Sequence, residues 1–165
     1  MLVATFVLTV VFDLVIAIEI GMVLAAILFM KRMADVTAVR TWTKLDSDND
    51  DKFKLLPDGC CVFEFNGPMF FASSEKFTEL PIDNDCRVMI IRMQNVPALD
   101  ISAMRSLNAL RKLCEDRGIA LLFSHINSQP LSVMRRSKFF GEDESEFVLS
   151  NIDDALTKAS EILSK

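Results

Sequence analysis

The chain has 165 residues and a formal net charge of −5, and its charged residues are unevenly distributed. Residues 1–30 contain two acids and no Lys or Arg, whereas the rest carries all 18 basic residues and 21 acids, a net charge of −3. This length supports one compact domain rather than two, and the sequence has no clustered basic face of the kind that binds nucleic acid.

The cysteines and the single histidine do not form a metal-binding pattern. Cys60 and Cys61 are adjacent, Cys86 and Cys114 are far apart, and no C-x-x-C spacing occurs. Structural zinc sites need paired ligands at short spacing, so we predict no metal, no cofactor and reduced thiols. We also predict no enzyme activity, because His125 has no nucleophile near it in sequence and there is no Gly-rich phosphate loop.

The first predicted element is a membrane segment, residues 1–34. Its apolar run 14–30 is interrupted only by Glu19 and Gly21, and roughly 20 apolar residues in a helix cross a bilayer. The apolar residues before Asp13 are too few to cross alone, so we predict one transmembrane helix preceded by the stump of another. A signal peptide is the alternative, but it would start with basic residues, and this segment has none.

Charged residues in and after this segment indicate orientation and function. Lys31 and Arg32 follow the apolar run directly, and basic residues favour the cytoplasmic side. We therefore predict a protein of the plasma (inner) membrane that contacts lipid and has a cytoplasmic C-terminal domain. Acids are costly inside a bilayer, which makes Asp13 and Glu19 candidate intramembrane functional residues. For Asp13, a loop at the membrane surface is the alternative.

Residues 35–58 are predicted to be a charged linker. The acidic run that starts at Asp46 resembles the beginning of a calcium-binding EF-hand loop. The Gly and Glu that such a loop needs at its sixth and twelfth positions are Asp51 and Pro57 here. We therefore predict a solvated linker and no calcium site.

From residue 59 to residue 165, short apolar runs alternate with helical patterns. This alternation predicts an α/β domain with a mixed, partly parallel sheet flanked by helices. Strands are predicted at residues 62–65, 69–72, 87–93, 120–123 and 147–149, and helices at 73–80, 102–117, 130–141 and from 150 onward. The turn-forming triplet 66–68 predicts a hairpin of the first two strands. The last helix should pack on the sheet through an apolar stripe, namely Ile152, Leu156, Ala159 and Leu163.

Three strings, in this order and spacing, resemble one known family. FDLVIAIEIGMVLAAILFMKRMADVT (residues 12–37) resembles the last transmembrane region of SulP anion transporters, which continues into a cytoplasmic STAS domain, named for sulfate transporters and anti-sigma-factor antagonists. VFEFNGPMFFASSEKF (residues 62–77) is similar to the opening strand pair of that domain, and VPALDISAMRSL (residues 96–107) is similar to its Asp-x-Ser/Thr-Gly/Ala loop.

The resemblance implies a STAS-like fold and the C-terminal portion of a SulP-type secondary transporter of sulfate-like anions. In that family the substrate site is built from earlier helices. We therefore expect either a fragment of a longer protein or a separate small subunit. Its STAS domain would be a regulatory and protein-interaction module. The partners so implied are the remainder of the transporter, a cytoplasmic regulatory protein and, as a further option, a second copy in a homodimer.

The loop that holds Asp100 and Ser102 is the candidate regulatory and interaction site. Either side chain can cap the helix that follows, which requires no function. A helix N-terminus also favours anions, and the resemblance to anti-sigma-factor antagonists implies phosphorylation of Ser102. The alternative function is thus a membrane-tethered anti-sigma-factor-antagonist-like switch that a kinase phosphorylates on Ser102. A generic tether needs no Asp13, Glu19 or Gly21, so the transporter is favoured.

Overall fold

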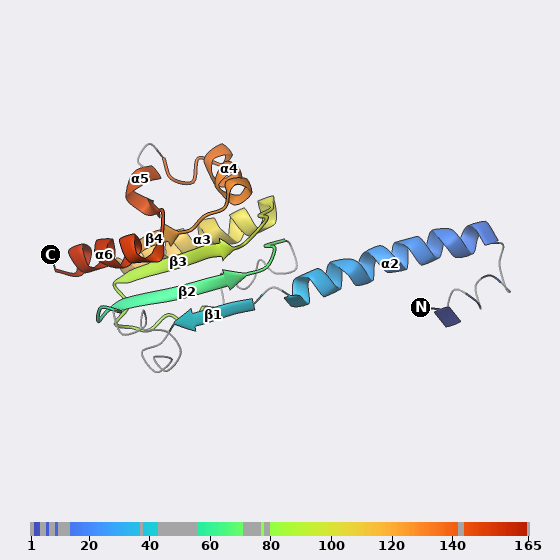
Figure 1. The fold of residues 1–165 in the computed structure, drawn as a ribbon, viewed down its shortest axis with the longest axis horizontal. Coiled ribbons are helices and arrows are strands. Elements are labelled where there is room, and N and C mark those ends of the chain that lie inside the picture. The colour runs from blue at the N-terminus through green and yellow to red at the C-terminus, as the bar shows by residue number, and fades with distance from the viewer. Residues whose placement is uncertain are drawn as a thin grey trace.

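The computed structural model describes residues 2–3, 6, 9, 14–36, 38–42, 56–70, 77, 80–141 and 144–164. A long helix precedes a sheet covered by helices (Figure 1). The helices are α2 (Leu14–Val36), α3 (Ile101–Arg117), α4 (Ser128–Arg136), α5 (Glu144–Phe147) and α6 (Ile152–Leu163). The strands are β1 (Ala38–Trp42), β2 (Cys60–Asn66), β3 (Val88–Asn95), β4 (Ala120–Ser124) and β5 (Val148–Leu149).

The five strands lie side by side in the order β1-β2-β3-β4-β5. Strand β1 is antiparallel to β2, and the other neighbours are parallel. The predicted mixed, partly parallel sheet with flanking helices is therefore confirmed, and most of its strand pairs are parallel. The central strand β3 begins with four consecutive side chains that are fully buried, Val88, Met89, Ile90 and Ile91. Such a run is expected in a strand covered on both faces.

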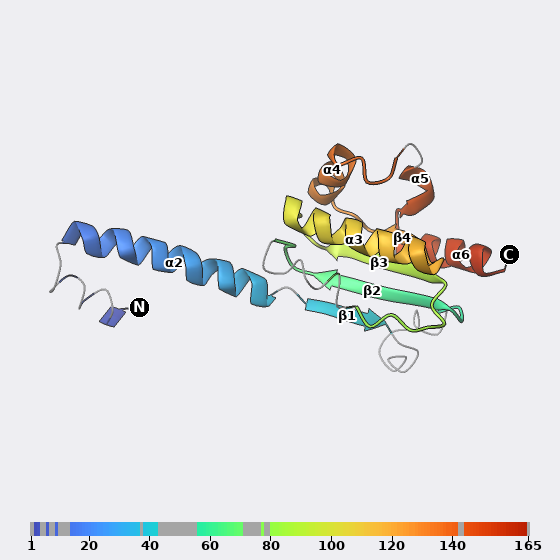
Figure 2. The same cartoon turned by 180° about the vertical axis from the view of Figure 1, so that it is seen from behind.

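Side chains that alternate along the strands form two separate cores. On one face, Phe63 and Phe65 of β2 pack with the apolar sides of α3 and α4. On the other face, Val62 of β2 and Ile90 of β3 pack with α6. Figures 1 and 2 show α3 behind the sheet in one view and in front of it in the other. The domain thus has three layers, with the sheet in the middle.

The strand β1 lies within residues 35–58, which were predicted to be a linker. It pairs along β2 from Ala38 opposite Asn66 to Trp42 opposite Val62. The sequence AVRTW contains the β-branched and aromatic residues that favour strands. This short strand was not predicted, because the acidic run that follows it favours a solvated linker. Residues 43–55, including the run at Asp46, lie outside the described residues.

The predicted hairpin of residues 62–65 and 69–72 is wrong. The antiparallel partner of β2 is β1, and Met69 instead forms an isolated parallel bridge with Leu99. Pro68 has no N–H to donate to a ladder, and Gly67 adopts φ 96, which turns the chain towards the loop after β3. Most of the predicted helix 73–80 lies outside the described residues.

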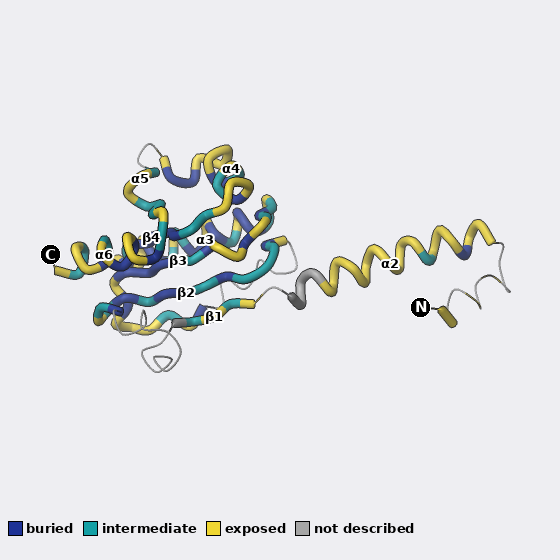
Figure 3. The backbone as a smooth tube through the Cα atoms, in the orientation of Figure 1, coloured by how far each residue is buried: buried dark blue, intermediate teal, exposed yellow. Residues whose placement is uncertain are grey.

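The helix α2 contains one stretch, Leu14–Arg32, that is long and apolar enough to cross a membrane by length and composition. The mean hydropathy of this stretch is 2.3, and only 6% of it is buried inside the structure. Figure 3 shows α2 as a mostly exposed helix that extends away from the buried sheet. A helix that is apolar all round needs a non-aqueous environment or other helices. Asp13 and most of the residues before it lie outside the described part of the chain.

Replacement of Leu156 by Asp tests the packing of α6 on the sheet. Leu156 is 6% exposed and belongs to the core between α6 and the sheet. A carboxylate there has no cationic partner in that apolar core, so we expect the free energy of unfolding to fall by about 3 kcal/mol or more. The control is Thr157→Asp, an exposed position on the same helix. Equal midpoints in chemical denaturation for both variants would contradict this packing.

Two fragments test the role of β1. We expect residues 38–165 to be soluble and to unfold cooperatively. Residues 59–165 lack β1 and the buried Leu56, and so expose the hydrogen-bonding edge of β2 to solvent. We expect this shorter fragment to unfold at a lower temperature when both are followed by circular dichroism. An identical transition for the two fragments would show that β1 contributes nothing to stability.

Candidate interaction site at the carboxyl ends of the parallel strands

The carboxyl ends of β2 and β3 lie beside the end of α2. Helix α2 ends at Val36 and β1 begins at Ala38, so at most about 7.6 Å separates their Cα atoms. Ala38 is opposite Asn66, which is opposite Asn95. Both ribbon views show α2 leaving the domain at this edge (Figures 1 and 2). The loops that follow β2 and β3 therefore gather at the edge nearest the apolar helix.

Backbone hydrogen bonds hold the loop between β3 and α3 against the segment that follows β2. The Gly67 N–H donates to the Asn95 carbonyl at 2.9 Å. The Met69 N–H donates to the Ala98 carbonyl at 2.9 Å, and the Asp100 N–H donates to the Met69 carbonyl at 3.1 Å. These bonds extend the pairing of β2 and β3 beyond the ends of the strands.

Two amide side chains at the start of α4 hold the same loop from its other side. The Gln129 amide accepts from the Leu99 N–H at 2.8 Å and donates to the Leu99 carbonyl at 3.2 Å. The Asn127 amide donates to the carbonyls of Gln94 at 2.9 Å and Val96 at 2.8 Å. Since both sides of the loop are bonded, its backbone is fixed before any partner binds.

Asp100, rather than Ser102, caps α3. Asp100 has extended backbone angles, and its side chain accepts a hydrogen bond from the Ala103 N–H at 2.8 Å. This geometry satisfies one of the helix's unpaired N–H groups. Ser102 lies in the first turn of α3 and is half-buried. The structure thus resolves the two capping alternatives and leaves the Ser102 hydroxyl unnecessary for the cap.

An apolar pair of side chains accompanies these polar residues. Ile101 is 64% exposed and Phe70 is 41% exposed. Ile101 follows Asp100, and Phe70 follows Met69. Because the Asp100 N–H donates to the Met69 carbonyl, the two apolar residues occupy neighbouring positions at one edge of the domain. Among the residues from Ala38 onward whose exposure the structure describes, Phe70 and Ile101 are the large apolar residues that are exposed. These two side chains, together with the fixed loop of Asp100 and Ser102, make up the candidate contact site.

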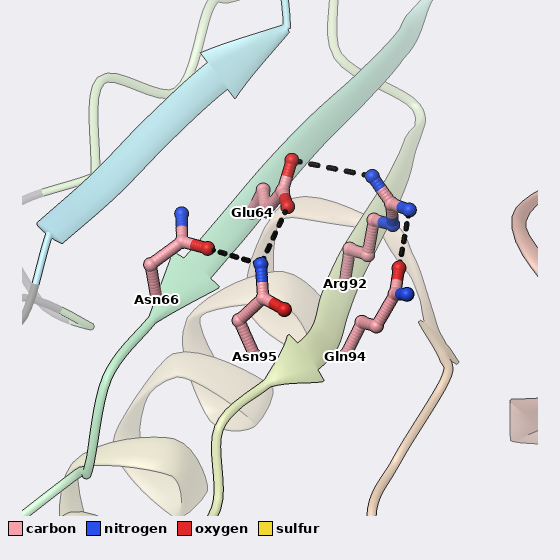
Figure 4. Close-up of polar contacts among 5 residues, drawn as sticks. All are labelled: Glu64, Asn66, Arg92, Gln94 and Asn95. Atoms are coloured by element: carbon pink, nitrogen blue, oxygen red, sulfur yellow. Dashed lines mark hydrogen bonds and ion pairs between the residues drawn. The ribbon is translucent and has the colours of Figure 1, made fainter.

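A polar cluster covers the same end of β2 and β3 on the α6 side of the sheet (Figure 4). The Arg92 guanidinium lies 3.3 Å from the Glu64 carboxylate and also donates to Gln94. The Asn95 amide donates to Asn66 at 2.6 Å and to Glu64 at 3.4 Å. These bonds tie the ends of the two strands together through side chains as well as through the backbone.

This polar cluster lies where α6 no longer covers the sheet. Helix α6 crosses the sheet diagonally and ends with Leu163 against Gly59, at the amino end of β2. Glu64 and Arg92 therefore remain half-buried rather than buried. Beside Arg92 on β4 is Ser124, which is fully buried and whose hydroxyl has no hydrogen-bond partner among the described residues.

The structure brings two of the four predicted site residues together. Asp100 and Ser102 lie at the start of α3. Glu19 is an exposed residue of α2, about 25 Å along the helix axis from its C-terminal end at Val36. Asp13 lies outside the described residues. Among the residues that are described, no three His, Cys, Asp or Glu side chains are grouped so that they could hold a metal ion.

The polar cluster and the apolar pair were not predicted from the sequence. Glu64 and Asn66 are two residues apart, as are Arg92 and Gln94, and residues at this spacing lie on one face of a strand. That spacing was a signal for a polar patch. Nothing in the sequence alone marked Phe70 or Ile101 as exposed, because apolar residues usually predict burial.

Comparison with known proteins identifies the domain. The STAS domain family matches residues 56–159. The chain is 26% identical over 142 residues to the putative sulfate transporter YvdB of Bacillus subtilis, which covers 84% of this chain and 26% of that protein. The chain spans between 17% and 28% of the length of the curated relatives that it matches.

Two solved structures share the fold. A sulfate transporter family protein from Wolinella succinogenes has a TM-score of 0.64 and 29% identity, and covers 71% of this chain and 98% of its own. The murine anion transporter Solute Carrier 26 family member A9, at 19% identity, has a TM-score of 0.75 over 96% of this chain and 28% of its own. At that identity the second likeness concerns the fold alone. The chain belongs to the STAS domain family, and its STAS domain is of the kind found in SulP/SLC26 anion transporters, with an apolar helix before it.

Proposed function

We propose that this chain is the C-terminal portion of a SulP-type secondary transporter of sulfate-like anions. Helix α2 would be the last membrane helix, and the STAS domain a cytoplasmic module for regulation and protein interaction. One observation carries this proposal: the register that joins Ala38, Asn66 and Asn95 sets the fixed loop of Asp100 and Ser102 at the edge of the sheet where α2 ends and β1 begins. The relatives of this domain are transporter STAS domains rather than enzymes, which supports a role without catalysis.

The short junction between α2 and β1 supports mechanical coupling. One residue lies between them, and β1 is hydrogen-bonded to β2 along its whole length. A rotation or shift of α2 would therefore move the edge of the sheet, because a connection of one residue allows the helix and the strand little independent movement. In the same way, a partner that binds at this edge would favour one position of α2 over another.

The chemistry of the loop supports a protein contact. Phe70 and Ile101 offer apolar area, and Asp100 and Ser102 offer short polar groups in a backbone that is already fixed. Such preorganisation lowers the entropy cost of binding. The expected partners are the cytoplasmic loops of the transporter's own membrane part and a regulatory protein that competes with them.

Phosphorylation of Ser102 is the second candidate regulation. It is favoured by the finding that Asp100 provides the cap, so that the hydroxyl of Ser102, a half-buried residue in the first turn of α3, is not needed for capping. A phosphate there would add nearly two negative charges at a helix N-terminus. An anti-sigma factor antagonist from Mycobacterium paratuberculosis shares the fold, with a TM-score of 0.51 and 14% identity.

Replacement of Ser102 by Asp tests the contact. We expect the melting temperature of the chain to stay the same, because Asp suits the first turn of a helix. We expect sulfate uptake by the complete transporter in vesicles to change at least about twofold, because charge is added at the contact. The control is Ser160→Asp, an exposed position near the far end of α6, which should leave both quantities unchanged.

The two readouts separate the alternatives for Ser102. A lower melting temperature for Ser102→Asp would mean that the residue is structural. Wild-type stability together with wild-type uptake would contradict the contact at this loop.

A topology measurement tests the orientation of α2. Lys31 and Arg32 are exposed at the end of the apolar stretch, and basic residues are retained on the cytoplasmic side. We expect a fluorescent protein fused after Ala38 to fluoresce and a phosphatase fused there to be inactive. Replacing both basic residues by Gln should reduce the preference of this end of α2 for the cytoplasmic side. An active phosphatase in the unmodified sequence would contradict a cytoplasmic STAS domain.

A further inference from the structure

We propose that a cavity between α3, β4 and the segment after α4 binds a small aromatic carboxylate, whose carboxylate group contacts Arg111. The cavity has a volume of about 270 Å³. In both ribbon views α4 and α5 lie beside α3 and beyond β4 (Figures 1 and 2). Arg111 belongs to the C-terminal half of α3, whereas the loop of Asp100 and Ser102 lies at the start of that helix. The inference therefore does not depend on the proposed function.

The end of α3 forms one side of the cavity. Gly118 adopts φ 67, and its N–H donates to the Glu115 carbonyl at 3.1 Å. The Ile119 N–H donates to the Cys114 carbonyl at 2.8 Å. This pair of bonds is a Schellman motif, which ends a helix and turns the next apolar residue back towards it. Ile119 thereby lines the cavity just before β4 begins.

The end of α4 forms the opposite side through the same motif, with a lysine in place of glycine. Lys138 adopts φ 53, and its N–H donates to the Arg135 carbonyl at 2.9 Å. The Phe139 N–H donates to the Met134 carbonyl at 3.0 Å. A positive φ costs energy for a residue that has a Cβ, so packing has to maintain this turn. Phe139 and Phe140, which follow it, are both buried and both line the cavity.

The lining of the cavity is mainly aromatic. The ring centroid of Phe123 on β4 lies 5.6 Å from that of Phe139 and 5.7 Å from that of Phe140, and the last two are 5.1 Å apart. All three pairs meet edge to face, which aromatic rings prefer, and Phe147 completes the lining. An aromatic ligand would add contacts of this kind. The volume of 270 Å³ exceeds that of the cavity of about 150 Å³ which holds benzene in another protein.

Arg111 places hydrogen-bond donors at this cavity. Its guanidinium donates to the Glu115 carboxylate at 2.8 Å and to the Phe139 carbonyl, and its Cζ lies 5.5 Å from the centroid of the Phe139 ring. These contacts hold the side chain in position before a ligand arrives. They use two of the five N–H donors of a guanidinium, and Arg111 has no other partner among the described residues. Two of the remaining donors can bind one carboxylate.

Glu115 is the charged group that opposes a carboxylate ligand. Its side chain is 59% exposed, compared with 39% for Arg111, so water screens its charge more than that of the guanidinium. An exposed ion pair of this kind contributes little stability, and Arg111 can therefore bind a second carboxylate. The Cys114 thiol, which also lines the cavity, is uncharged at neutral pH because burial raises its pKa to about 11.

The test uses the whole chain in lipid nanodiscs, with carbon-13 in the methyl groups of isoleucine. 2-Naphthoate is the probe, and its binding is followed by nuclear magnetic resonance. We expect the methyl signal of Ile119 to shift, whereas that of Ile90, in the core on the α6 side of the sheet, stays in place. The same nanodisc is used throughout, so partition of the probe into lipid affects every variant equally.

Two further probes define the class of ligand in the wild-type chain, so that the result does not depend on any variant folding. 2-Naphthalenemethanol keeps the rings and lacks the charge, and we expect it to bind at least about tenfold more weakly than 2-naphthoate. Octanoate keeps the charge and lacks the rings, and we expect it to bind at least about threefold more weakly. Equal affinity of either compound and 2-naphthoate would overturn the assignment of an aromatic carboxylate.

Variants of α3 test the role of Arg111. We expect Arg111→Gln to weaken 2-naphthoate at least about tenfold and to leave the affinity for 2-naphthalenemethanol unchanged. Glu115→Gln should strengthen binding of 2-naphthoate, because it removes the opposing charge. The matched control is Arg105→Gln, an exposed position on the same helix, which should change neither affinity. An unshifted Ile119 signal in the wild-type chain, or wild-type affinity for 2-naphthoate in Arg111→Gln, would overturn the proposal.

Discussion

The pairing of β1 with β2 is the constraint on which the arrangement of this protein depends. Because one residue joins α2 to β1, the position of β1 fixes where the apolar helix meets the domain. The antiparallel register then sets Ala38 opposite Asn66, at the carboxyl end of β2. If β1 ran in the opposite direction, the helix would meet the amino ends of the parallel strands, and a different set of loops would lie beside it.

The parallel strands give the domain two chemically different ends. Their carboxyl ends carry the loop of Asp100 and Ser102, the exposed Phe70 and Ile101, and the polar side chains shown in Figure 4. Their amino ends carry Cys61 and the segment of Cys86, which lie in or against the core on the α3 side of the sheet. Because all the parallel strands run in the same direction, the residues that follow them gather at one edge of the sheet and the residues that precede them gather at the other.

The rigidity of the loop before α3 comes from groups that are distant in sequence. Gln129 and Asn127 reach the loop from the start of α4, and Met69 reaches it from the end of β2. Each bond satisfies a backbone group that would otherwise need water. The loop can therefore present short side chains in a fixed position.

The elements whose pattern is local could be predicted from the amino-acid sequence. The long apolar helix, the helix between Asp100 and Gly118 and the buried strand β3 follow from apolar runs, helical periodicity and cap residues. The antiparallel partner of β2 could not be predicted, because strand pairing depends on segments that folding brings together from far apart in the chain. The fold also decided the exposure of Ile101. Neither property belongs to a residue alone, since strand pairing and exposure both depend on neighbours that the fold supplies.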